Sequence, residues 1–255
     1  MGELTAVNRT AVGVAAVRAF ESARADRLFD DPYARALSAG HVAAPTVGEP
    51  AAEQRRWLRA HVVLRTRFYD ELLLGAAVDQ IVLLAAGLDA RAWRLPWPSG
   101  TTVYELDQPQ VLSYKAERLA ARPGVDRRAV AVDLRDDWPA ALLGAGFDAA
   151  RPAAWLVEGL LAYLGPAEAR KLLADVTGLA AAGSVLGCER TGPMRRVAGT
   201  VSALWRGGLP EGATAVLSDL GWLAAETQCA TLASRWARPD LDGINAELVT
   251  ATRPG

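Results

Sequence analysis

The sequence predicts an α/β fold in which a mostly parallel, doubly wound sheet follows an N-terminal helical cap. Two observations support this prediction. Short apolar runs alternate with helical patterns between residues 81 and 188, an arrangement typical of βαβ units in a parallel sheet. Before residue 77, by contrast, apolar side chains recur at helical spacing.

Helices are predicted for most of the first third of the chain. Residues 10–24 carry apolar side chains at three- and four-residue steps, and residues 31–33 begin a second helix, because their proline suits a first helical turn. Residues 38–50 are rich in glycine, proline and small residues and predict a loop. Residues 53–74 predict a longer helix.

The sheet is predicted from short apolar runs that end at turn residues. The apolar run at 81–85 predicts a strand buried on both faces. Four further strands are predicted at 101–107, 128–132, 153–157 and 184–188. Helical patterns follow the middle strands at 110–121, 139–143 and 167–181, and a further helix is expected at 213–220. Two last strands, 228–233 and 247–251, lack a clear crossover helix between them. We expect them to pair as an antiparallel hairpin at the sheet edge.

Composition excludes several classes of function. The 255 residues contain 28 Lys+Arg and 29 Asp+Glu, for a net charge of −1 without a basic tract, which argues against binding to nucleic acid or anionic membranes. No apolar run approaches the roughly 20 residues of a transmembrane helix, and residues 1–6 lack a signal-peptide pattern. Cys188 and Cys229, without a C-x-x-C motif, predict neither disulfides nor a metal site, and so favour the cytoplasm.

We therefore expect a single cytoplasmic domain over residues 1–255. Its parts are a helical cap at 1–76, a ligand-binding core at 77–190 and a variable segment with the terminal strands at 191–255. A chain of this length can bury a sizeable core as one domain. Its oligomeric state is left open, with a homodimer as one alternative.

Informative residues follow four predicted strands, and ligands of open α/β sheets bind beyond the carboxyl ends of strands. These residues are Gly87 and Asp89, then Glu105 and Asp107, then Asp133 and Leu134, and finally Glu158. A glycine lets a ligand approach the backbone, and a carboxylate about 20 residues later can accept two ribose hydroxyls. Asp133 and Leu134 could contact an adenine amino group and ring. Singly, each also fits a turn, a solvated cap or a surface ion pair; four in chain order favour a nucleoside ligand.

The first of these turns distinguishes among nucleotides. Residues 85–90 hold one glycine, with Asp89 where a phosphate would lie, whereas dinucleotide sites use G-x-G-x-x-G. A carboxylate repels pyrophosphate but accepts a hydrogen bond from an ammonium group. The turn thus favours S-adenosylmethionine as cofactor and makes a nicotinamide-dependent oxidoreductase the weaker alternative.

Several motifs resemble the leucine carboxyl methyltransferase family, and more closely its bacterial branch of S-adenosylmethionine-dependent O-methyltransferases. They are AAGLDARAWRL at 85–95, VYELDQP at 103–109, VDLR at 132–135 and EGLLAYL at 158–164, with TAVG, RAFE, DPYA and RTRFYD between residues 10 and 70. The resemblance implies a class I methyltransferase fold: Rossmann-like, with a mostly parallel seven-stranded sheet, an antiparallel last strand at the edge, and a helical cap. Ala85 departs from the family, which usually has glycine there.

The resemblance also implies roles for individual residues. Arg65, with Arg67 as the alternative, would bind the cofactor's carboxylate, Gly87 its methionine portion, Asp107 its ribose, Asp133 and Leu134 its adenine, and Glu158 its amino group. The planar guanidinium of an arginine suits a carboxylate because it binds bidentately. Tyr163 either faces the methyl acceptor or packs beneath the site.

The expected reaction is attack of an acceptor oxygen on the sulfonium methyl group. A carboxylate acceptor is already ionised at neutral pH, whereas a phenol or alcohol would need a base, for which His41 and His61 are the candidates. His61 lies on the apolar side of its predicted helix, which favours a packed core residue instead. Trp205 and Trp222 are candidates for an aromatic acceptor pocket.

We therefore predict a small-molecule O-methyltransferase, with carboxyl methylation of a specialised metabolite as the leading hypothesis. The alternatives are methylation of a phenol or hydroxyl, methylation of a protein C-terminus as in the eukaryotic relatives, and a non-catalytic protein that binds the cofactor.

Overall fold

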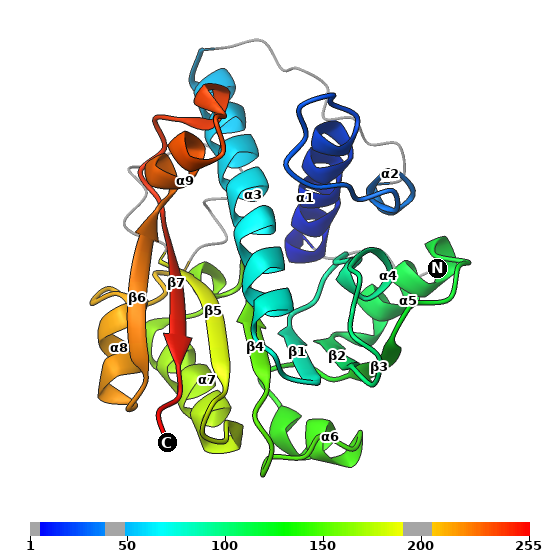
Figure 1. Ribbon diagram of the computed structural model, residues 1–255, viewed down its shortest axis with the longest axis vertical. Coiled ribbons are helices and arrows are strands. Elements are labelled where there is room, and N and C mark those ends of the chain that lie inside the picture. Colours follow the sequence, from blue (N-terminus) through cyan, green and yellow to red (C-terminus); the bar gives the residue numbers. More distant parts are fainter. Residues whose placement is uncertain (1–5, 39–48, 191–205) are drawn as a thin grey trace.

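The structure is a computed structural model that describes residues 6–38, 49–190 and 206–255. Within these residues, seven strands form one sheet in the order β3-β2-β1-β4-β5-β7-β6 (Figure 1). The strands are β1 Gln80–Leu84, β2 Thr102–Asp107, β3 Asp126–Ala131, β4 Ala154–Val157, β5 Val185–Arg190, β6 Leu223–Gln228 and β7 Glu247–Thr252. Strands β1 to β5 pair in parallel, and β7 is antiparallel to both of its neighbours. The predicted Rossmann-like sheet with an antiparallel last strand is confirmed.

The strand order reverses at β1, which makes the ends of β1 and β4 the switch point of the sheet. Leu83 of β1 lies beside Glu105 of β2 on one side and Leu156 of β4 on the other. The chain first winds outward through β2 and β3, and then returns to β4. Ligands of such sheets bind where the strand order reverses.

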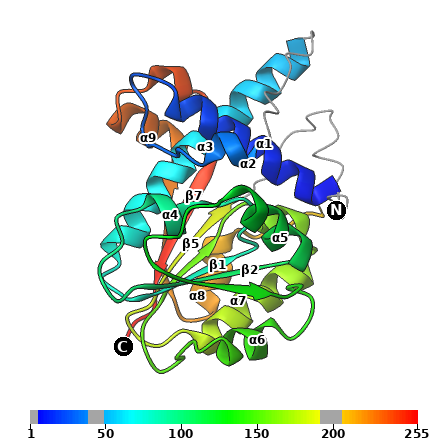
Figure 2. The same cartoon turned by 90° about the vertical axis from the view of Figure 1, so that its right-hand side faces the viewer.

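Helices cover both faces of the sheet and its carboxyl edge. They are α1 Ala6–Ser22, α2 Ala34–Leu37, α3 Glu49–Gly75, α4 Arg91–Arg94, α5 Pro109–Arg118, α6 Trp138–Gly144, α7 Pro166–Leu179, α8 Ala213–Asp219 and α9 Cys229–Arg235, with 3-10 turns η1 Leu161–Tyr163 and η3 Pro239–Leu241. Figures 1 and 2 show α1, α2 and α9 beyond the end toward which the parallel strands point. No helix in the described ranges has the length and apolar character needed to cross a bilayer.

Alternating side chains of each central strand enter two separate cores. Val82 and Leu84 pack with α6, α7 and α8 on one face. Ile81 and Leu83 pack with α3 and α9 on the other. Because helices cover both faces, β1 is buried along its whole length, and its sequence is an unbroken apolar run rather than an alternating one.

The last third of the chain differs from the sequence-based expectation. The predicted strand at 228–233 is wrong, because the strand is Leu223–Gln228 and the next residues form helix α9. Strand β6 is mostly exposed, so its sequence lacks an apolar run. In α9, buried Cys229, Leu232 and Ala233 share the spacing of one helix face.

Strand β7 also lies elsewhere than expected. It pairs with β5 on one side and β6 on the other, so β6 is the edge strand and the antiparallel strand lies inside the sheet. Strands β6 and β7 do pair antiparallel, but α9 and η3 separate them in sequence, so they form no hairpin. Pro50, predicted to lie in a loop, belongs to the first turn of α3, where its lack of an N–H group costs nothing.

Candidate active site

The turn after β1 is held in an unusual backbone conformation. Ala85 has φ +51° and Gly87 has φ +50°, a left-handed region that glycine adopts readily and alanine does not. A Cβ atom built on Gly87 would lie 3.5 Å from Cβ of Ala11 in α1. The turn therefore passes directly beneath the helical cap.

Asp107 at the end of β2 fastens this turn to the neighbouring strand. Its carboxylate accepts the N–H of Gly87 at 2.6 Å and that of Gln108 at 2.7 Å. Burial raises the pKa of Asp107, and these two N–H groups oppose the rise. The predicted ribose contact thus stands beside the predicted methionine contact.

A hollow of about 540 Å³ opens beyond the ends of β2 and β3. It is lined by Gln108, Pro109, Gln110, Ala131, Val132, Asp133, Arg135 and Asp136, and its volume is within the ~300–1,000 Å³ range of small-ligand sites. Gln108 Nε2 donates to Asp133 at 2.9 Å. Hydrogen bonds from the exposed Arg135 hold the pKa of Asp133 well below its usual range. Leu134 is half-buried against the core on the α6–α8 side.

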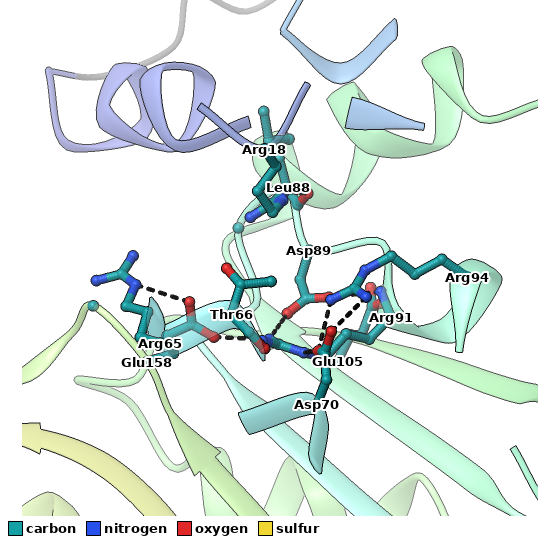
Figure 3. Close-up of polar contacts among 12 residues, drawn as sticks. Arg18, Arg65, Thr66, Asp70, Leu88, Asp89, Arg91, Arg94, Glu105 and Glu158 are labelled. Carbon is teal, nitrogen blue, oxygen red and sulfur yellow. Dashed lines mark hydrogen bonds and ion pairs between the residues drawn. The ribbon is translucent and has the colours of Figure 1, made fainter. Parts of the chain in front are cut away.

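A chain of largely buried ion pairs joins the cap to the ends of β1, β4 and β5. Figure 3 shows its part from Arg65 through Glu158 and Arg91 to Asp70. We call the whole set the ion-pair chain, and its members are Arg18, Asp31, Arg65, Asp70, Asp89, Arg91, Arg94, Glu158 and Glu189. Four arginines therefore meet five carboxylates. Buried charges persist only where each has partners, and here the partners come from elements far apart in sequence.

Arg91 is the centre of this chain. Its side chain is 2% exposed and contacts three carboxylates: Asp70 at 2.7 Å, Glu158 at 2.7 Å and Asp89. Burial alone would raise the pKa of Asp89, but the guanidinium groups around it, Arg91 above all, lower it to about 2. The Asp89–Arg91 pair is thus a buried contact and not the surface pair that its sequence spacing also allowed.

Arg65 lies between two carboxylates at the ends of β4 and β5. Its Nε is 2.9 Å from Glu158 and its Nη1 is 3.0 Å from Glu189. Glu189 also accepts the N–H of Gly159 at 2.9 Å. Glu189 was not among the residues predicted from the sequence, although a carboxylate near the end of the fifth parallel strand follows the rule that identified the other four strand ends.

Two predicted cofactor contacts lie outside this group. Arg67 is half-exposed on α3 and pairs with Glu71 at 2.8 Å. Glu105 is fully buried on the face covered by α5, with Lys115 at 2.8 Å and Arg127 at 2.7 Å. Both side chains already have partners away from the switch point, so we leave them out of the proposed site.

Sequence comparison identifies the family. Residues 11–177 match the family model described as leucine carboxyl methyltransferase. The chain belongs to the leucine carboxyl methyltransferase family. One relative from Parafrankia, named as an inferred S-adenosyl-L-methionine-dependent methyltransferase, is 43% identical over 96% of this chain and 84% of its own. A relative from Frankia alni with a name of the same kind is 42% identical over 98% of this chain and 96% of its own.

Solved structures agree with the family assignment at the level of the fold. A Streptomyces avermitilis protein superposes with a TM-score of 0.58 at 19% identity, covering 94% of this chain and 97% of the other. An inferred methyltransferase from Thermobifida fusca gives a TM-score of 0.55 at 19% identity, covering 94% of each chain. This member of the family thus has a fold found in solved structures of distant sequence.

The predicted acceptor-side residues, His61 and Tyr163, lie in different surroundings. His61 is 4% exposed, packs against Trp57 with tilted rings whose centroids are 4.6 Å apart, and places Nε2 3.6 Å from Glu189. Burial, with a smaller contribution from Arg65, holds the pKa of His61 well below 6.5. Tyr163 is half-buried in η1, just after β4.

The proposed tryptophan pocket is not found where it was expected. Trp222 is 2% exposed, donates from Nε1 to Thr177 at 2.8 Å and belongs to the core on the α6–α8 side, so the prediction that it lines an acceptor pocket is wrong. Trp205 and His41 lie outside the described residues.

Proposed function

We propose that this protein transfers the methyl group of S-adenosylmethionine to the carboxylate of a small-molecule acceptor. As a member of its family it is an S-adenosylmethionine-dependent methyltransferase. The observation that carries the finer proposal is the partly buried Glu158 between Arg65 and Arg91 at the switch point of the sheet.

The charges at this point match the amino-acid end of the cofactor. An ammonium group would pair with Glu158 and a carboxylate with Arg65, so that each group keeps a partner of opposite sign. With every group ionised, the four arginines and five carboxylates of the ion-pair chain sum to −1. S-adenosylmethionine, with two positive groups and one negative, has the complementary charge of +1.

The nucleoside end fits the neighbouring strand ends. Asp107 stands between the Gly87 turn and the hollow beyond β2 and β3, where a ribose would join methionine and adenine portions. Asp133 borders that hollow and would accept a hydrogen bond from the adenine amino group. Leu134, the next residue, packs against the core beside it and would contact the adenine ring. Because Gly87 has no side chain, a ligand can approach the backbone of the turn closely.

The surroundings of the predicted base, His61, favour a carboxylate acceptor. The cofactor supplies an electrophilic methyl group that leaves S-adenosylhomocysteine behind, so the protein has to orient the acceptor and exclude water. His61 is the one histidine of the described ranges, and its low pKa makes it a poor proton acceptor. A carboxylate, with an ordinary pKa near 4, is ionised without help.

The free, buried thiols of Cys188 and Cys229 suit a cytoplasmic enzyme, and we include that location in the proposal. In this proposal the methyl acceptor is a small carboxylic acid of the cell's metabolism.

Calorimetry and a transfer assay test the proposal. We expect S-adenosylmethionine to bind in the micromolar range and NAD to give no heat. With radiolabelled methyl donor and a panel of carboxylic acids and phenols, we expect a product that mild base hydrolyses to labelled methanol, because methyl esters are base-labile and methyl ethers are not. A base-stable product would instead establish a hydroxyl acceptor, and binding without transfer to any acceptor would indicate a non-catalytic protein.

A further inference from the structure

We propose that Glu189 is a positioning residue that holds Arg65 in place for the carboxylate of the cofactor. This inference rests on the proposed function, because it assigns Glu189 a part in binding the amino-acid end of S-adenosylmethionine. Neither the family motifs nor the strand-end residues predicted from the sequence include Glu189.

Glu189 is anchored on both sides of its carboxylate. Oε1 accepts the N–H of Gly159 at 2.9 Å, and Oε2 accepts from Nη1 of Arg65 at 3.0 Å. The side chain is 4% exposed, and its strand is hydrogen-bonded to β4 and β7. Glu189 is thus a fixed point on the sheet, unlike Arg65, whose long side chain extends from helix α3.

Gly159 completes the cradle around the guanidinium of Arg65. A Cβ built on Gly159 would lie 3.3 Å from Nη2 and 3.5 Å from Nη1 of Arg65, closer than most such contacts. The glycine has φ +69°, a conformation that favours glycine independently of the space. The guanidinium therefore lies against the backbone that follows β4.

The contacts of Arg65 assign different tasks to its two carboxylate partners. Nη1 donates to Glu189, and Nε lies 2.9 Å from Glu158 in an ion pair without hydrogen-bond geometry. No described residue forms a hydrogen bond with Nη2. In the proposed function Glu158 turns to the ammonium group of the ligand. Glu189 then remains as the carboxylate that fixes Arg65, with Nη2 free to receive the ligand's carboxylate.

Glu189 itself is poorly placed to contact the ligand. Both of its oxygens are engaged by the protein, and His61 closes a further side at 3.6 Å. Burial raises the pKa of Glu189, and the charge of Arg65 opposes that rise. Its effect on the ligand should therefore pass through Arg65.

Two ligands that differ in one group make this testable. S-adenosylmethionine carries the carboxylate, and decarboxylated S-adenosylmethionine keeps the sulfonium, the ammonium and the nucleoside but lacks it. We expect Glu189→Gln to raise the Kd for S-adenosylmethionine about ten-fold, equivalent to about 1.4 kcal/mol. The Kd for the decarboxylated ligand should change less than two-fold. In an Arg65→Gln background, Glu189→Gln should add nothing for either ligand, because the two residues act as one unit.

Glu71→Gln is the matched control, since Glu71 holds Arg67 on the same helix but at its half-exposed surface, and it should change neither Kd. Thermal melting establishes that each variant is folded. If Glu189→Gln is unfolded, Glu189→Asp keeps the charge but shortens the side chain, and the same ligand-selective loss is expected of it.

Equal weakening of both ligands, or of neither, would overturn the positioning role while leaving the proposed function intact. A wild-type protein that binds neither ligand would overturn both.

Discussion

Nη1 of Arg91 lies 2.7 Å from Oε2 of Glu158, so a partly buried ion pair joins the turn after β1 to the end of β4. Figure 3 shows Arg91 extending between Glu158 and Asp70, and Arg65 on the opposite side of Glu158. The carboxylate predicted to bind the cofactor's ammonium therefore has two guanidinium partners in this structure. A ligand ammonium has to enter this set of charges rather than an uncharged pocket.

Replacing Glu158 tests its part in that exchange. We expect Glu158→Gln to weaken S-adenosylmethionine binding about ten- to a hundred-fold, because a charged hydrogen bond contributes ~1.5–3 kcal/mol. Calorimetry measures the effect. Glu168→Gln is the control, since Glu168 pairs with the exposed Arg206, and it should leave the Kd unchanged. An unaltered Kd in Glu158→Gln would remove Glu158 from the proposed site.

The two arginines of the RTRF segment should respond differently. Arg65→Lys retains the charge but loses the planar fork that binds a carboxylate bidentately, so we expect at least about a ten-fold rise in the Kd for S-adenosylmethionine. Arg67→Lys should have little effect, because Arg67 is half-exposed and paired with Glu71. The reverse pattern in a parallel titration would make Arg67 the cofactor ligand.

Acid should weaken the protein partly through Asp89. Its pKa of about 2 lies below the unfolded value of 3.8, so the stabilisation is complete above about pH 4 and is lost as the pH falls through 2. The shift corresponds to about 2 kcal/mol. Urea unfolding from pH 6 to pH 2 should show the stability of wild type converging on that of Asp89→Asn. Asp175→Asn removes a surface ion pair with the exposed Lys171. Its free energy of unfolding should change with pH in parallel with that of wild type.

The left-handed conformation of Ala85 predicts a stabilising substitution. At φ +51° an L-residue loses ~1 kcal/mol relative to its preferred conformations, and glycine has no such penalty. We expect Ala85→Gly to raise the free energy of unfolding by about 0.5–1 kcal/mol. Ala86→Gly, in the same turn but without a positive φ, should lower it, because Ala86 is buried. Denaturant titration of both variants decides whether the conformation matters.

Gly187 in β5 gives the opposite prediction. A Cβ there would lie 2.8 Å from ring atoms of Tyr69 and from Leu72, so Gly187→Ala should destabilise the protein by ~1–3 kcal/mol through overpacking against α3. Gly178→Ala in α7 meets no atom within 4 Å and should stabilise it by about 0.5–1 kcal/mol. A tolerated Gly187→Ala, measured by thermal melting, would show that α3 can shift away from the sheet.

Buried elements were the most predictable part of the fold. The runs that became β1, β2 and β4 are apolar because both faces of the sheet are covered, and their ends agree with the structure to within one residue. Strand β6 escaped prediction because an exposed edge strand needs no apolar side chains. The residues after it, from Cys229, are apolar but belong to a helix.

Part of the candidate site could be read from the sequence and part could not. Strand-end residues such as Gly87, Asp107 and Glu158 could be listed because parallel strands bring their carboxyl ends to one edge. Which groups pair was not visible, because a partner such as Asp70 for Arg91 comes from a helix 21 residues away. Glu105 and Asp107 are two residues apart on one strand. The structure alone shows that Glu105 forms a buried ion pair with Lys115, whereas Asp107 lies at the strand end beside Gly87.

The place of β7 has a consequence for how the protein is made. In the described sheet β6 bonds to β7 alone, so residues 223–228 leave the ribosome before the strand that can hold them exists. Until residues 247–252 are synthesised, β5 is an edge strand whose backbone N–H and C=O groups lack the partners that β7 later provides. Such an edge can pair with strands of other chains. Strand β5, which carries Glu189, is therefore paired on its second side only by β7, which follows every other strand of the described sheet in sequence. Glu189 thus gains its β7 neighbour only after the other residues proposed to hold the ligand have been synthesised.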